Sequence, residues 1–289
     1  MKKIAIVTDS SSGIKQSETT NNLFVVPMPF LIDGDDYYEN INLSQAEFYE
    51  KLKTDAKIST SQPSFGEVSE IWDKVLKDFD EIVYIPLSSG LSESCNSAIR
   101  YAQEEQYSGK VFVVNNQRVS VTLKASIQEA IELAKEGKSA EEIKEYLENS
   151  KFQSSIYIMV PTLKYLKKGG RITPAAAALG SLLSIKPILQ IQGEKLDTYA
   201  KVMNLAQAKS RMIGAIKKDI SDRFSDLIAE GKMHISIAHT NNEETALKFK
   251  EEIEASFPNI PIKFVDELPL VIACHIGPGS LAIALAKNQ

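Results

Sequence analysis

Three segments rich in hydroxyl side chains stand next to predicted strands or helices: Thr8–Ser12, Ser59–Ser64 and Ser88–Ser92. The first and third follow short apolar runs that are typical of buried strands. In a parallel sheet, ligands bind beyond the carboxyl ends of the strands, so we expect these two segments at one edge. Helix N-termini there offer free N–H groups and partial positive charge, and hydroxyls add uncharged donors. The pattern favours a site for a small anion or a carboxylate.

Each hydroxyl segment also has a simpler interpretation, because Ser, Thr and Asp are the preferred residues at helix N-caps. For any one segment alone, capping is the better interpretation. Asp9 could be a magnesium ligand, but a role as an N-cap explains this residue equally well. Only the presence of three such segments moves the balance towards a shared ligand site.

Two glycine-containing segments follow in the second half, Gly169–Ile172 and Cys274–Gly279. The glycine pair of the first segment predicts a helix C-cap, which is the default interpretation. Arg171, directly after that pair, could instead direct its guanidinium at a carboxylate or a phosphate. His275 follows an apolar run beside a glycine turn, where a ligand role and a structural hydrogen bond to the backbone are equally well supported.

Several known chemical templates are absent from the sequence. There is no GxxxxGK[ST] phosphate loop and no GxSxG nucleophile elbow. The run Gly277–Ala282 formally matches a dinucleotide fingerprint, but only seven residues follow it, so no βαβ unit can be completed. Cys95 and Cys274 are far apart, and the three histidines form no HxH or HExxH pattern. We therefore expect neither a disulfide framework nor a metal site.

Composition and charge describe an ordinary folded globular protein. The chain has 289 residues, of which 43% are hydrophobic and 25% charged. Its 33 Lys and Arg against 38 Asp and Glu give a net charge of −5, which argues against nucleic acid or an anionic membrane as the main partner. The apolar run after Lys3 is too short for a secretion signal, and Lys186 and Pro187 interrupt the longest apolar stretch, Pro174–Ile191. We expect a cytoplasmic protein without stable membrane insertion.

Strand and helix patterns alternate in the first half. The predicted strands are 4–7, 24–32, 81–87 and 111–114, and the prolines of 24–32 favour an edge or irregular strand. The predicted helices are 44–53, with a Ser44–Glu47 capping box, 67–79, 91–106, 118–136 and 140–149. Continuous apolar strands between helices indicate a mostly parallel, Rossmann-like sheet with helices on both faces.

The second half has a more mixed pattern. The predicted strands are 156–160, 234–239, 261–265 and 270–274, with an extended hairpin over 184–202. The predicted helices are 162–168, 204–230, 242–256 and 279–287. These elements predict two α/β domains, residues 1–155 and 156–289. The final strand and helix are free to pack back towards the ligand site.

In chain order, the segments Thr8–Ser12, Ser59–Ser64, Leu87–Ser92, Gly169–Ile172 and His275–Gly279 together resemble the motifs of the DegV family over essentially the whole chain. Each motif alone is weak, but five in order are highly specific. The resemblance implies a bacterial fatty-acid-binding protein with no cofactor, no metal and no catalysis of its own, and a lipid buried between its two domains. The lipid would be a long-chain fatty acid such as palmitate, stearate or oleate. A separate fatty acid kinase would convert its carboxyl to an acyl-phosphate for phospholipid synthesis.

The resemblance also implies the site residues. Thr60 and Ser92 match the hydroxyls that bond the carboxylate, and Ser61 stands beside Thr60. Arg171 and His275 match polar residues at the mouth of that site, where contact with the carboxyl or with the kinase is expected.

One departure from the family pattern follows Ser92. The family usually has Gly-Thr-Tyr there, whereas this chain has Glu93-Ser94-Cys95. Glu93 would repel a carboxylate unless it points into solvent, as a residue in the first turn of a helix can. The departure puts the identity and length of the ligand in question more than the fold.

Two other functions fit the same residues. The hydroxyl cluster could belong to an enzyme that acts on a small phosphorylated or carboxylated metabolite, or to a regulatory or structural protein with an incidental ligand. A wide apolar tunnel would favour the carrier, whereas a small polar pocket would favour the enzyme.

Overall fold

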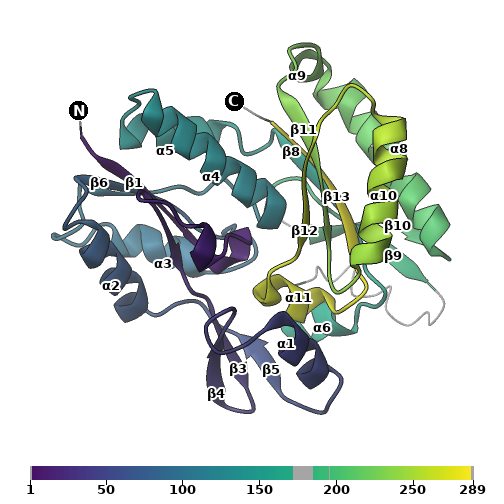
Figure 1. The fold of residues 1–289 in the computed structure, drawn as a ribbon, viewed down its shortest axis with the longest axis horizontal. Coiled ribbons are helices and arrows are strands. Elements are labelled where there is room, and N and C mark those ends of the chain that lie inside the picture. The colour runs from purple at the N-terminus through teal and green to yellow at the C-terminus, as the bar shows by residue number, and fades with distance from the viewer. Residues whose placement is uncertain (1, 172–184, 195, 288–289) are drawn as a thin grey trace. The chain divides into compact units, whose positions relative to one another are not determined.

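The computed structural model describes residues 2–171, 185–194 and 196–287. Its contacts divide the chain into two compact units. The first unit is Met1–Lys151 with Pro269–Val271, and the second is Phe152–Leu268 with Ile272–Gln289. Both units combine strands and helices, so the predicted mixed α/β class is confirmed (Figure 1).

A parallel sheet forms the centre of the first unit. Its strand order is β2-β1-β6-β7, and all three pairings are parallel, as predicted. The strands are β1 (Ile4–Asp9), β2 (Leu23–Val26), β6 (Glu81–Ile85) and β7 (Val111–Val113). Two short 3-10 turns, Ser10–Ser12 and Gln16–Glu18, follow β1.

Helices cover both faces of this sheet, as the continuous apolar strands predicted. The pairs are α4 (Ser120–Lys135) with α5 (Ala140–Asn149), and α2 (Phe65–Val75) with α3 (Ser94–Tyr101), on opposite sides of β1 and β6 in Figure 1. Side-chain alternation along β1 explains the two layers. Ile6 packs with Leu123 of α4, whereas its neighbour Val7 packs with Trp72 of α2.

A small antiparallel sheet in the first unit was not predicted. Its order is β4-β3-β5, with β3 (Pro29–Ile32), β4 (Asp35–Tyr38) and β5 (Ile58–Thr60). The stretch predicted over 24–32 is two strands in different sheets, β2 at the predicted edge position of the parallel sheet and β3 in the small sheet, so its prediction as one strand was wrong. Proline has no N–H to donate, and the pairing of edge strand β2 with β1 ends at Val26, directly before Pro27. The next helix, α1 (Gln45–Leu52), has the predicted capping box, in which Glu47 N–H donates to Ser44 Oγ over 3.3 Å.

The second unit contains a six-stranded mixed sheet. Its order is β10-β9-β8-β13-β11-β12, and β11 and β12 are its parallel pair. The strands are β8 (Ser154–Met159), β9 (Lys186–Ile191), β10 (Leu196–Val202), β11 (Met233–His239), β12 (Ile262–Glu267) and β13 (Leu281–Lys287). Strands β9 and β10 form the predicted antiparallel hairpin.

Helices α8 (Leu205–Arg223) and α10 (Glu243–Ser256) pack on this sheet around a core that contains Met212, Phe249 and Ile237. The helix predicted over 204–230 is in fact two helices, because the chain leaves helical geometry at Phe224 before α9 (Ser225–Ala229). Phe224 is buried in the core, so packing outweighs helix continuity there. Helix α6 (Lys164–Gly169) follows β8.

The types of the last two elements were predicted the wrong way round, with a strand first and a helix second. Residues predicted as the strand 270–274 form helix α11 (Leu270–Ile276), and those predicted as the helix 279–287 form β13. A short apolar run does not reveal its period, and Pro269 is a favourable residue at a helix start. Strand β13 lies between β8 and β11 and is buried along almost its whole length, so sheet packing outweighs the helix propensity of its Ala and Leu residues.

None of the described helices is long and apolar enough to cross a membrane. The apolar stretch Pro174–Ile191 lies largely outside the described residues, and its last six residues form β9.

Candidate functional site

The loops after β1 and β6 lie side by side at the carboxyl edge of the parallel sheet. Thr8 and Ile85 are paired near the ends of these strands, so the first and third hydroxyl segments start next to each other, as predicted. Asp9 joins the two loops. Its fully buried carboxylate accepts hydrogen bonds from Leu87 N–H (2.8 Å) and from Ser11 N–H (3.0 Å) and the Ser11 hydroxyl.

Asp9 is therefore an N-cap and a tie between loops, which is the simpler of its two interpretations. Burial raises the pKa of Asp9, and the hydrogen bonds from Ser11 and Leu87 act in the opposite direction. Within the described residues, no group of three or more His, Cys, Asp or Glu side chains could hold a metal ion.

Ser92 lies just before α3 in the loop after β6. Its hydroxyl oxygen accepts from Ser94 N–H (3.2 Å). A serine hydroxyl has one donor and two acceptor sites, so Ser92 keeps its O–H to donate to an anion. Glu93 is exposed, and its carboxylate accepts from the Asn96 amide (3.1 Å). The side chain that departs from the family pattern thus faces solvent.

The second hydroxyl segment begins at the end of β5. Thr60 is half-buried and pairs with Phe30 of β3. Ser61 is exposed, and its hydroxyl donates to the Gln62 carbonyl over 3.2 Å. The Gln62 side-chain oxygen in turn accepts from the Ser97 hydroxyl of α3 over 3.2 Å. This bond connects the second segment to α3, the helix that begins two residues after Ser92.

Arg171 and His275 come together in the second unit. Gly170 has a left-handed conformation (φ 67°) and is the predicted C-cap of α6, and Arg171 then donates to the Gly169 carbonyl over 2.6 Å. The His275 ring lies against Gly169 so closely that a Cβ there would be 2.2 Å from its Nδ1. The glycine pair therefore both ends the helix and admits the histidine. Ile172, the last residue of this motif, lies outside the described residues.

His275 lies near the end of helix α11, so its predicted place at a strand end is wrong. Burial and the nearby Arg171 charge lower its pKa to about 4, so the imidazole is neutral at neutral pH. It can exchange hydrogen bonds with a carboxylate but does not neutralise its charge. The glycine turn after it is tightly packed, since a Cβ on Gly277 would lie 2.3 Å from the Tyr165 ring.

The structure thus groups Thr60, Ser61 and Ser92 in the first unit and Arg171 and His275 in the second. One segment at the sheet edge was missed by sequence reasoning. It is Asn115–Arg118, which begins two residues after the end of β7. The rule that ligands bind beyond strand ends could have found it. The pattern that pointed to the other segments was a run of hydroxyl side chains, and this segment has amide side chains and an arginine instead.

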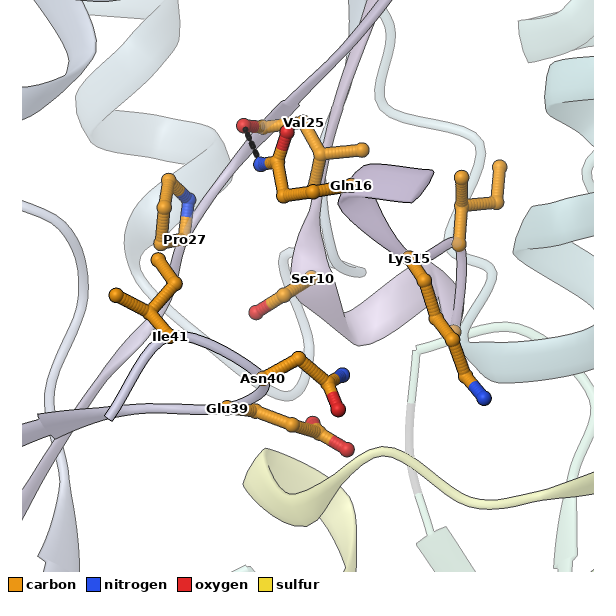
Figure 2. A pocket seen from close by; sticks show the side chains of 10 residues that line it. Ser10, Lys15, Gln16, Val25, Pro27, Glu39, Asn40 and Ile41 are labelled. Carbon is orange, nitrogen blue, oxygen red and sulfur yellow. Dashed lines mark hydrogen bonds between the residues drawn. The ribbon is translucent and has the colours of Figure 1, made fainter. Parts of the chain in front are cut away.

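A small pocket lies beside the loop after β1 (Figure 2). Its volume is about 30 Å³, and Ser10, Glu39 and Asn40 are among its lining residues. Met28 N–H donates to Ser10 Oγ (3.0 Å), and Leu270 N–H donates to Glu39 (2.8 Å). A space of this size is on the scale of one or two water molecules, so it does not hold an acyl chain.

Comparison with known proteins identifies the family. A family model described as "Uncharacterised protein, DegV family" matches residues 3–288. The chain belongs to the DegV family. The DegV resemblance inferred from five short motifs is thereby confirmed.

This DegV protein has similar relatives across its whole length. It is 31% identical to a DegV domain-containing protein of Staphylococcus aureus, over 100% of both chains. A solved structure from Thermus thermophilus, described as fatty acid binding of a DegV family protein, has a TM-score of 0.87 and 28% identity and covers 99% of each chain. The fatty acid binding protein DegV of Bacillus subtilis has a TM-score of 0.84 and 29% identity, with 100% of both chains covered.

Proposed function

We propose that this DegV protein binds a long-chain fatty acid and holds it by its carboxylate. The observation that carries the proposal is the full-length similarity to two solved relatives described as fatty-acid-binding, at 28% and 29% identity. Palmitate, stearate and oleate are the ligands we expect. No cofactor is needed for this role.

The hydroxyl segments of the first unit supply chemistry that suits a carboxylate. Ser92 keeps a hydroxyl proton to donate, and Thr60 ends the strand that leads to Gln62, which is bonded to α3. Hydroxyl donors give a carboxylate directional hydrogen bonds without a fixed opposite charge. We therefore assign the carboxylate contacts to Thr60 and Ser92. Ser61 has a smaller part, because its hydroxyl is bonded to the Gln62 carbonyl.

The acyl tail would contribute most of the affinity. A palmitate tail has about 14 CH₂ groups at roughly 0.8 kcal/mol each, which is on the order of 10 kcal/mol before the costs of association. Binding of this strength survives purification, so we expect the acid to remain with the protein.

We further propose that a separate fatty acid kinase phosphorylates the bound carboxyl, and that this protein acts as its binding partner in the cytoplasm. Arg171 is exposed, and a guanidinium pairs well with carboxylate and phosphate oxygens. His275 is neutral and next to Arg171, where it can exchange a hydrogen bond with the carboxyl or with the kinase. Both residues are therefore assigned to transfer as well as to binding.

Titration of delipidated protein tests the proposal. We expect palmitate to bind tightly at one site and its methyl ester, which keeps the tail but has no charged head group, to bind more weakly. Saturable binding of a small phosphorylated metabolite, with no uptake of palmitate, would contradict the proposal and favour the enzyme.

A further inference from the structure

The loop Asn115–Arg118 lies at the same sheet edge as the hydroxyl segments. It follows β7, which pairs in parallel with β6. Ser88 N–H, in the loop after β6, donates to the Arg118 carbonyl over 3.1 Å. The two loops are therefore joined by a direct hydrogen bond, and the DegV motifs assign no role to the second of them.

Asn116 is the buried amide of this loop. It is 1% exposed, and neither its Oδ1 nor its Nδ2 has a hydrogen-bond partner among the described residues. The buried hydroxyls of Ser89 and Ser94, just before and after Ser92, also have no partner in that part of the chain. A buried polar group without a hydrogen-bond partner loses its interactions with water and gains none in return, which destabilises the fold. Such a concentration of unsatisfied groups is expected where a polar ligand binds.

The loop is held in a defined shape by its surroundings. Asn115 N–H donates to Glu148 (2.9 Å), and the Arg118 guanidinium donates to the Ser126 hydroxyl (3.0 Å) and the Ser150 carbonyl (3.0 Å). Gln117, between them, has a positive φ of 57°. A non-glycine residue in that conformation is strained, and such strain concentrates at ligand sites. These contacts fix Asn116 before any ligand arrives.

The charge of the loop also suits an anion. Arg118 is 1% exposed, and the two acceptors that its guanidinium reaches among the described residues, the Ser126 hydroxyl and the Ser150 carbonyl, are neutral. Glu129 is the acidic group whose charge acts on it. The buried guanidinium directly after Gln117 adds positive potential at the loop, which the Glu129 charge offsets in part, and positive potential favours a carboxylate over a neutral head group.

We propose that Asn115–Arg118 is a third segment of the head-group site and that the Asn116 amide donates a hydrogen bond to the bound carboxylate. The inference rests on the proposed fatty-acid function. It adds a residue that selects the acid over ligands with the same tail and an uncharged head group.

The test compares Asn116→Leu with the unaltered protein and with Asn259→Leu, an exposed control. Leucine has nearly the same size and no polar atoms, so it removes the unsatisfied amide without a large cavity. We expect the melting temperature without ligand to be unchanged or higher. Affinity for palmitate should fall about tenfold, since one hydrogen bond to a charged group is lost. Affinity for hexadecanol should fall less, because a hydrogen bond to its uncharged hydroxyl is weaker than one to a carboxylate.

Three results would overturn the inference. If Asn116→Leu binds palmitate as tightly as the unaltered protein does, Asn116 makes no hydrogen bond to the carboxylate. The proposed fatty-acid function would not be affected by that result. If Asn116→Leu has a lower melting temperature and loses the same factor of affinity for palmitate and for hexadecanol, the role of Asn116 is structural. Failure of the unaltered protein to bind either ligand would overturn both proposals.

A second measurement needs no substitution. The side-chain amide resonance of Asn116, followed by nuclear magnetic resonance in the unaltered protein, should shift with palmitate more than with hexadecanol. Equal shifts with the two ligands would contradict the proposed hydrogen bond.

Discussion

The buried carboxylate of Asp9 accepts a hydrogen bond from Leu87 N–H over 2.8 Å, which ties the loop after β1 to the loop after β6. Its other oxygen accepts two bonds from Ser11. An asparagine at this position has a single acceptor oxygen, so it can keep only one of the two connections.

Asp9→Asn should therefore lower the free energy of unfolding by about 1–3 kcal/mol, measured by urea denaturation. Asp80→Asn is the matched control, because Asp80 also accepts one backbone N–H bond (2.7 Å, from Lys3) but is exposed. If Asp9→Asn is no more destabilised than the control, the carboxylate does not hold the two loops together.

The double substitution Thr60→Ala with Ser92→Ala tests the carboxylate contacts. The fold should be retained, and affinity for palmitate should weaken by about 1–3 kcal/mol for each lost bond, measured by calorimetric titration. Ser61→Ala is the control, since its exposed hydroxyl is bonded to the Gln62 carbonyl, and its effect should be small. Equal affinities in the double variant and the unaltered protein would refute this assignment.

The lowered pKa of His275 predicts that the stability of the protein depends on pH. Its pKa is about 4 in the folded protein and near 6.5 in the unfolded chain. Between these values the unfolded chain binds the proton and the folded protein does not. The contribution of His275 is therefore fully present above about pH 6.5 and is lost as the pH falls towards 4.

His275→Gln should remove that loss of stability. The difference in unfolding free energy between variant and unaltered protein should therefore change between pH 7.5 and pH 5, where the unfolded chain takes up a proton at His275 and the folded protein does not. His234 and His239 are present in both proteins and cancel in the difference. A difference that is constant over this range would show that His275 titrates normally.

Arg171→Ala tests coupling to a kinase. With purified fatty acid kinase and ATP, acyl-phosphate formation should fall about tenfold or more, as expected when a charged hydrogen-bonding group is lost. Lys168→Ala removes an exposed positive charge from the same segment and should have little effect. Similar rates of acyl-phosphate formation in the two variants would mean that the positive charge of the segment matters, and not a specific contact of Arg171.

Much of this architecture is predictable from local patterns. The parallel sheet follows from continuous apolar strands between helices, and α1 follows from its Ser44–Glu47 capping box. The order of the last two elements was not predictable, because the apolar run 270–276 fits either period, and β13 is a strand only through its position between β8 and β11. The break at Phe224 likewise depends on core packing.

The site was predictable in part for similar reasons. Residue type and spacing indicated a hydroxyl-lined sheet edge and the DegV motifs. The bond between Asp9 and Leu87 and the unsatisfied amide of Asn116 require atomic positions. The same is true of the fit of His275 against Gly169, because sequence alone shows only that a glycine and a histidine are present.

Native mass spectrometry of the purified protein, followed by solvent extraction, tests the central claim most directly. The account predicts one long-chain fatty acid per chain, released by the solvent and identified by its mass. An unloaded protein that also takes up no added palmitate, stearate or oleate would contradict it.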